Sequence, residues 1–233
     1  MPGSPCGSCR LLMRAWILVA ACAVLAPGRA ASAPEVETRD FSVFVDGKPS
    51  GDVHMTINKQ EDGSVIMTCD TDIKVVVGVG PFSKQYTYSY RGREVWKDAR
   101  LQRFDSNCND DGKRSAVGAV AEGDKLRIRV NNEEKLVPGD VWLSSYWAMP
   151  DNEKINQTVA IIDADTGSSL SSKIQFLGVE PRTVAGQAQK VNHFRLTGKT
   201  QLDLWYDVTG RLIAQDWVEE GHRTKVELNR LRR

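Results

Sequence analysis

The sequence predicts a mainly β protein, built as one large curved antiparallel sheet or open half-barrel in meander order with one short helical insertion. Three observations support this prediction. Turn signals such as Asp46-Gly47 and Glu220-Gly221 recur between short apolar runs. Apolar and polar residues alternate within these runs, most clearly in the segment 64–78. Amphipathic stretches of about 10–15 residues, which alternate with strands in parallel-sheet proteins, do not occur in the pattern.

The first element is a predicted signal peptide, residues 1–33. Arg10 and Arg14 precede an apolar run at 15–26, and small residues follow at 30–33. This order is typical of secretory signals, and the run is shorter than the ~20 apolar residues that span a bilayer. We therefore expect an exported, periplasmic or extracellular protein without a transmembrane segment after cleavage. The cleavage site stays open between 30 and 33.

A second interpretation of the N-terminus is a lipoprotein signal. The segment 19–22 (Val-Ala-Ala-Cys) resembles a bacterial lipobox, in which the cysteine is lipidated and becomes the new N-terminus. In that case the mature protein is anchored through Cys22. The apolar run continues beyond Cys22, which favours ordinary cleavage.

Cysteine usage predicts a disulfide in the mature chain. Cys6, Cys9 and Cys22 all lie in the predicted signal peptide, so only Cys69 and Cys108 remain after cleavage. An even pair in an exported protein favours a bridge, because export places the pair in an oxidising compartment. The alternative is two free, buried thiols.

Residues 34–233 are predicted to form a single β-rich domain. Strands and turns fill the region from about 37 to 137 and resume after 155. The last five predicted strands are 173–184, 189–197, 201–207, 211–218 and 222–229. Whether the sheet closes on itself stays open.

One segment interrupts the strand pattern and is predicted to contain a short helix, at about 140–149. Asp140 can cap it, Trp142, Tyr146 and Met149 follow at helical spacing, and Pro150 ends it. We interpret the segment as an insertion that crosses the single domain.

Charge and motifs argue against several functional classes. The 31 basic and 30 acidic residues give a net charge of +1, without the basic excess that nucleic-acid binding favours. The acidic turn 105–112 fits no calcium-loop register, and the three histidines lie far apart. No nucleophile, phosphate-loop or dinucleotide motif occurs. We therefore predict no catalytic residue, no metal ligand and no cofactor, and leave open whether any catalysis occurs.

Aromatic residues are the strongest candidates for a binding surface. Tyr86, Tyr88 and Tyr90 alternate along one strand and line one face. Phenol and indole rings suit a groove that is apolar but not wholly dry, although each ring alone could equally fill the core. The predicted ligand-binding residues are Tyr86, Tyr88, Tyr90, Trp96, Trp142, Tyr146, Trp147 and Trp205.

Four segments carry a resemblance to a known family: 93–98, 109–113, 142–147 and 203–212. Together they resemble a family of exported bacterial proteins described only as a domain of unknown function, over essentially the whole mature chain. The strand meander is also similar, at the level of fold, to the half-barrel of periplasmic lipoprotein carriers, which hold acyl chains on a concave apolar face. This second similarity implies a fold and not an activity.

These observations predict an exported, non-catalytic envelope protein that binds a lipid, acyl or other apolar ligand on the concave face of its sheet. The alternative is a structural or protein-interaction module of the envelope, with a protein partner there. An enzyme acting on envelope glycans or lipids is the least supported class. The sequence fixes neither the ligand nor the oligomeric state.

Overall fold

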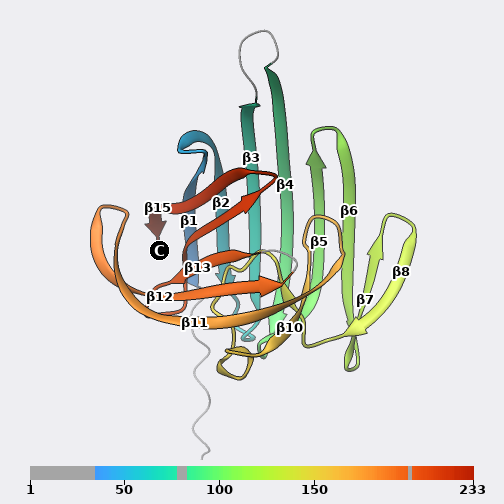
Figure 1. The fold of residues 1–233 in the computed structure, drawn as a ribbon. Helices are drawn as coiled ribbons and strands as arrows, with labels where there is room; N and C mark the ends of the chain where they lie inside the picture. Colours follow the sequence, from blue (N-terminus) through green and yellow to red (C-terminus); the bar gives the residue numbers. More distant parts are fainter. Residues whose placement is uncertain (1–34, 78–82, 199–200) are drawn as a thin grey trace, which may run out of the picture. The chain divides into compact units, whose positions relative to one another are not determined.

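The computed structural model describes residues 35–77, 83–198 and 201–233. The predicted signal peptide and its lipobox cysteine lie outside these ranges. The described residues belong to the compact unit Ser32–Arg233, and the following account concerns that unit alone (Figure 1).

Fifteen strands of the described residues form one hydrogen-bonded sheet. Their bounds are β1 (Glu35–Val45), β2 (Lys48–Lys59), β3 (Val65–Val77), β4 (Lys84–Lys97), β5 (Arg100–Asp110), β6 (Lys113–Glu122), β7 (Lys125–Val130), β8 (Glu133–Pro138), β9 (Trp142–Leu143), β10 (Thr158–Ile162), β11 (Ser169–Val184), β12 (Gln187–Gly198), β13 (Leu202–Tyr206), β14 (Leu212–Glu219) and β15 (His222–Arg232). The spatial order is β8-β7-β6-β5-β4-β3-β2-β1-β15-β14-β13-β12-β11-β10-β9. The predicted meander is confirmed, and the pairing of β1 with β15 joins its two halves.

The sheet is curved, open and mixed. Neighbouring strands pair antiparallel except β9 and β10, which are parallel, so the prediction of a wholly antiparallel sheet is wrong at this edge. The two ends of the order, β8 and β9, are not joined by any ladder between described residues. In Figure 1 strands β11 to β13 run across strands β3 to β6. We call the gap in the ladder between β8 and β9 the seam.

Period-two alternation places one apolar face inside the curve. One cross-strand row runs from β3 to β7 through Met67, Glu94, Phe104, Ala119 and Ile128. All five are buried, at 2% exposure or less. This inner face carries the core, and Glu94 is the one charged residue in the row.

The inner face is covered by the segment 139–168, which we call the cover segment. The Ser106 hydroxyl donates to the Ala164 carbonyl at 2.6 Å, and the Ser115 hydroxyl donates to the Asp165 carbonyl at 2.5 Å. These bonds hold the cover segment on β5 and β6. Its buried side chains are Val141, Trp142, Leu143, Tyr146, Val159, Ile161, Ile162 and Ala164.

The predicted helix at 140–149 is wrong. Trp142 and Leu143 form a two-residue strand beside β10, and the only helical turn among the described residues is the 3₁₀ turn η2, Asn152–Lys154. Tyr146 has φ 48°, a left-handed conformation that an α-helix cannot contain. The aromatic residues are spaced as in a helix, but they are buried by contacts on several sides of an irregular segment and not by one face of a helix.

The predicted disulfide is also wrong. Cys69 and Cys108 are both free and buried. They lie on β3 and β5 with β4 between them, opposite Gly92 and Tyr90 respectively. Two strand spacings amount to ~9.6 Å, beyond the ~7 Å between Cα atoms that a disulfide can bridge. Burial raises the pKa of Cys69 to about 12 and that of Cys108 to about 11, so both thiols stay protonated at neutral pH.

None of the described helical structure is long and apolar enough to cross a membrane.

Candidate functional site

A groove of about 700 Å³ opens along the seam. One wall comes from β4, from the turns at the ends of β5 to β7 and from the end of β8, and the other comes from the cover segment. The size is typical of small-molecule sites, at roughly 300–1,000 Å³. Its apolar lining consists of Trp96, Ala99, Pro138, Gly139, Val141, Trp142, Trp147, Ala148, Met149 and Pro150.

Two indole rings on opposite walls of the groove meet over a buried carboxyl. Trp96 of β4 and Trp147 of the cover segment pack edge to face, with ring centroids 6.5 Å apart. Both indole nitrogens donate to Oε2 of Glu94, at 2.7 Å and 3.0 Å. Glu94 therefore fixes the orientation of both rings and ties the cover segment to the sheet.

The second oxygen of Glu94 has no partner. Oε1 is buried and unpaired, as is the Tyr90 hydroxyl on the same strand. Burial raises the pKa of Glu94 to about 7, against hydrogen bonding from Ser145, Trp96 and Trp147, which acts to lower it. A carboxyl with this pKa exchanges its proton near neutrality.

Ionisation of Glu94 is expected to destabilise the fold at neutral and higher pH. The ordinary pKa is 4.5 and the folded value is about 7, so between these pH values only the folded state keeps the proton. Below pH 4.5 the proton is bound in both states, so Glu94 does not lower the free energy of unfolding. This free energy falls between pH 4.5 and about pH 7, and above that range it is lower by about 3 kcal/mol. Glu94→Gln removes this pH dependence, because glutamine does not ionise. The difference in free energy of unfolding between the variant and wild type should therefore increase by about 3 kcal/mol in favour of the variant from pH 4.5 to about pH 8.

Urea denaturation of both proteins across that range measures the effect. Glu153→Gln, an exposed change in the cover segment, is the matched control and should follow the wild type. Parallel pH profiles for wild type and Glu94→Gln would contradict the assignment.

A second carboxyl, which is half-buried, also ties the cover segment to β4. The Tyr88 hydroxyl donates to Oδ2 of Asp165 at 2.8 Å. Burial raises the pKa of Asp165 to about 6, and the neighbouring charges of Asp163, Asp110 and Glu219 also raise it, whereas the Tyr88 bond lowers it. Glu94 lies on the sheet and binds a cover residue, while Asp165 lies on the cover segment and binds a sheet residue.

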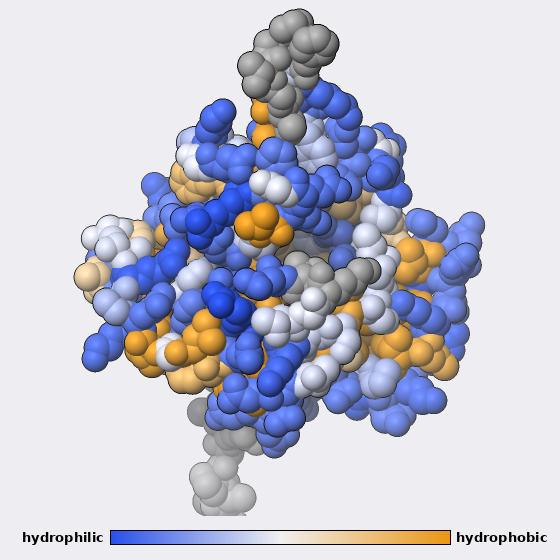
Figure 2. Space-filling view, viewed as in Figure 1, coloured by the Kyte–Doolittle hydropathy of each residue, from blue (hydrophilic) through white to orange (hydrophobic). Residues whose placement is uncertain are grey.

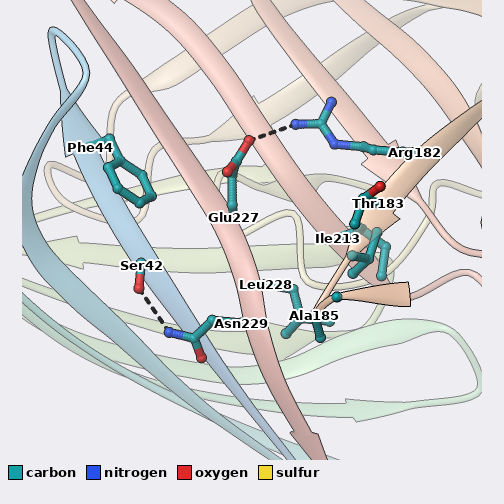
Figure 3. Close-up of a pocket in the computed structure, with 11 residues that line it drawn as sticks. Ser42, Phe44, Arg182, Thr183, Ala185, Ile213, Glu227, Leu228 and Asn229 are labelled. Atoms are coloured by element: carbon teal, nitrogen blue, oxygen red, sulfur yellow. Dashed lines mark hydrogen bonds and ion pairs between the residues drawn. The ribbon is translucent and has the colours of Figure 1, made fainter. Parts of the chain in front are cut away.

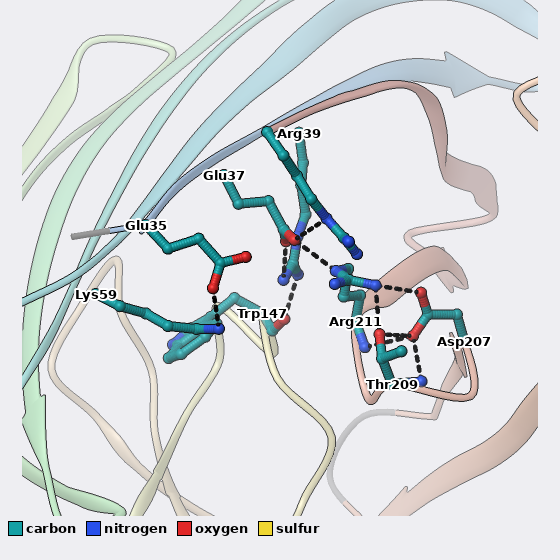
Figure 4. A network of polar contacts seen from close by, with 9 residues as sticks. Glu35, Glu37, Arg39, Lys59, Trp147, Asp207, Thr209 and Arg211 are labelled. Carbon is teal, nitrogen blue, oxygen red and sulfur yellow. Dashed lines mark hydrogen bonds and ion pairs between the residues drawn. The ribbon is translucent and has the colours of Figure 1, made fainter. Parts of the chain in front are cut away.

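A buried ion network holds the backbone of the cover segment (Figure 4). Arg39 of β1 is 3% exposed and pairs with Glu37 at 2.7 Å, and it donates to the Trp147 carbonyl at 2.6 Å. Arg211 bridges Glu37 and Asp207, at 2.5 Å and 3.1 Å. Although burial acts to raise it, the pKa of Glu37 is lowered by these two arginines. The network fixes the position of Trp147 from the side opposite Glu94.

A second, smaller pocket of about 360 Å³ lies between β1, β15 and the end of β11 (Figure 3). Four of its polar side chains are already paired: Arg182 with Glu227 at 2.9 Å, and Asn229 with Ser42 at 2.8 Å. We therefore take the seam groove as the candidate site.

The structure brings half of the predicted ligand-binding residues together at the groove. Trp96, Trp142 and Trp147 line the groove. Tyr146 packs on Trp142 with ring centroids 4.9 Å apart and is buried behind it. The groove therefore contains three of the eight predicted residues and is backed by a fourth.

The three tyrosines of β4 support the site without lining the groove. Tyr86 donates to Asp110 at 2.5 Å, and Tyr88 binds Asp165. Tyr90 lies over Gly92, where a Cβ atom would be 2.1 Å from its hydroxyl oxygen. The space that Gly92 leaves is thus occupied by the buried phenol.

Trp205 lies apart from the groove. It stacks on His193 at 4.5 Å, receives Arg182 over its ring at 4.3 Å and donates to Glu180 at 2.6 Å. The neighbouring Tyr206 instead reaches the carbonyl of Tyr146 in the cover segment. Since successive strand residues point to opposite faces, Trp205 belongs to the outer face.

Four charged residues of the site were not found by sequence reasoning: Glu37, Arg39, Glu94 and Asp165. A signal for two of them exists in the alternation. Glu94 has the same parity as the tyrosines of β4, and Arg39 has the same parity as the buried Phe41. A charged residue at an inward position predicts a buried, paired group.

The fold and groove define an open, curved β-sheet protein with a covered inner face. A family profile matches residues 41–229, and the chain belongs to this family, Domain of unknown function (DUF6134). Among solved structures, the chain is similar to a β-barrel-like protein of domain of unknown function DUF1849 from Brucella abortus, with 9% identity and a TM-score of 0.59 over 84% of this chain and 96% of that one. At this identity the likeness concerns the fold alone. A search of curated proteins gave no match.

Proposed function

We propose that the protein is an exported, non-catalytic binding protein of the bacterial envelope, which holds a lipid, acyl chain or other apolar ligand in the seam groove. The single observation that carries the proposal is the pair of indole rings, Trp96 and Trp147, which line a groove of about 700 Å³ and are oriented by one buried carboxyl. Rings fixed in this way present apolar area without a conformational cost on binding.

The charges at the rim of the groove fit a ligand whose apolar part is buried and whose polar end stays in water. Lys154 pairs with Asp151 at 3.2 Å, and Arg100 donates to a backbone carbonyl. Asp124 and Asp140 complete the rim. A mixed rim of this kind gives no strong preference for an anionic or a cationic head group, so the apolar part is expected to dominate affinity.

The test is mass spectrometry of what co-purifies with the mature chain from an envelope fraction under native conditions. We expect an apolar molecule in stoichiometric amount, released by organic solvent. A stoichiometric protein partner without any such molecule would instead support an interaction module.

The interaction-module alternative has less support on the face that Figure 2 shows. Figure 2 shows apolar residues on the visible face in several separate groups among hydrophilic ones. Protein-binding faces more often carry one contiguous apolar patch.

A further inference from the structure

We propose that the seam is a gate, which opens and closes in linkage with the protonation of Glu94 and Asp165. This gate would regulate access to the groove. It rests on the proposed function only for the kind of molecule that enters.

Side-chain contacts and one backbone bond, from Gly139 to Asp124 at 2.9 Å, close the seam in place of a backbone ladder. The ladder between described residues ends at β8 on one side and at β9 on the other. Several of the side-chain bonds between β4 to β6 and the cover segment end on carboxyl groups: Trp147 and Ser145 bind Glu94, and Tyr88 binds Asp165. The two remaining bonds come from Ser106 and Ser115 hydroxyl groups and involve neutral groups only.

The surroundings of Glu94 oppose its ionisation. Glu94 is fully buried, with 0% exposure, and its Oε1 has no partner. The titratable groups that face it are the Cys69 thiol of β3 and the Tyr90 phenol of β4. From the cover segment it meets Ser145 and Trp147, which are neutral. Nothing in this set can balance a negative charge.

The groups around Asp165 act in the same direction. The facing titratable groups are Tyr88 and Tyr90 of β4, Cys69 of β3, Asp110 and Cys108 of β5, Asp163 of the cover segment and Glu219 of β14. The carboxylates among them repel a charge on Asp165.

The direction of the linkage follows from these surroundings. As pH rises from the ordinary carboxyl range through 6 and 7, the closed seam holds both carboxyls protonated longer than water would, and lifting the cover segment lets them ionise in water. The open state is therefore favoured at higher pH, and the closed state is favoured in mild acid. If opening restores the ordinary pKa of Glu94, that group alone should raise the opening constant by about 30-fold between about pH 5.5 and pH 8.

Hydrogen exchange of the ligand-free mature chain tests the gate. We expect the protection factors of amides in the cover segment to fall by about 30-fold or more over that pH range, and to stay below those in β12 and β13, which open only when the whole fold opens. In Glu94→Gln and Asp165→Asn, each of which keeps the hydrogen-bond acceptor, the pH dependence should shrink, most strongly in the first. Glu153→Gln is the control and should behave as wild type.

Three results would overturn the gate: protection of the cover segment that is independent of pH, protection there as high as in β12 and β13 at every pH, and an unchanged pH dependence in Glu94→Gln. Should Glu94→Gln fail to fold, Trp147→Phe provides the second test, because it removes the donor and keeps the carboxyl. It should lower protection of the cover segment at low pH, and unchanged protection there would also overturn the proposal. The experiment needs no ligand, so the gate can be confirmed or overturned even if no ligand of the groove is found.

Discussion

Trp142→Ala is expected to lower the free energy of unfolding by about 3–5 kcal/mol, as aromatic truncations in cores do. Trp142 is 8% exposed and packs on Tyr146. It also stands in β9, at the free edge of the sheet. Truncation leaves a cavity where the edge meets the inner face, and no adjoining ladder can close it.

Chemical denaturation measures this effect, and Val208→Ala is the control. Val208 is 80% exposed, and its truncation should change stability by less than ~0.5 kcal/mol. A cost for Trp142→Ala as small as that of the control would mean that the Trp142 ring is not part of the packed core.

Arg39→Met should cost about 3–5 kcal/mol, because removing one member of a buried ion network leaves the others without compensation. Glu37 is 7% exposed and would keep only the bond from Arg211 and a longer contact with Arg233. The Trp147 carbonyl would lose its partner as well. Binding in the groove should therefore weaken together with stability.

The matched control is Arg103→Met on β5. Arg103 pairs with Asp105 at 2.6 Å, but both side chains are about half exposed. Such pairs contribute ~0–1 kcal/mol. If the two arginine variants lose the same stability, the buried network does not hold the cover segment in the way described.

The strand meander could be predicted from the sequence, because period-two alternation and turn residues are local signals. The last five strands begin and end within a few residues of their predicted bounds. The cover segment could not be predicted in the same way. Its aromatic residues have helical spacing, but burial between the sheet and the ends of β13 and β14 decides their backbone, and this depends on contacts distant in the sequence.

The site shows the same division. Trp96 and Trp147 were predicted as members of one surface because ring type and insertion are visible in the sequence. The carboxyl that joins them was not predicted. The alternation shows only that Glu94 points inward, and the contact with Trp147 depends on the folded structure. The prediction of a disulfide between Cys69 and Cys108 was wrong for a related reason, because a count of cysteines takes no account of the strand that separates them.

The most direct test of the groove is a titration of the mature chain with a fluorescent long-chain fatty acid. We expect one molecule to bind per chain, and Trp147→Ala to weaken its affinity by about tenfold or more, which is ~1.4 kcal/mol. Trp205→Phe, an aromatic change on the outer face, should leave the affinity unchanged. Equal affinity in all three proteins, or no binding by the wild type to this or any other long-chain apolar probe, would contradict the proposed function.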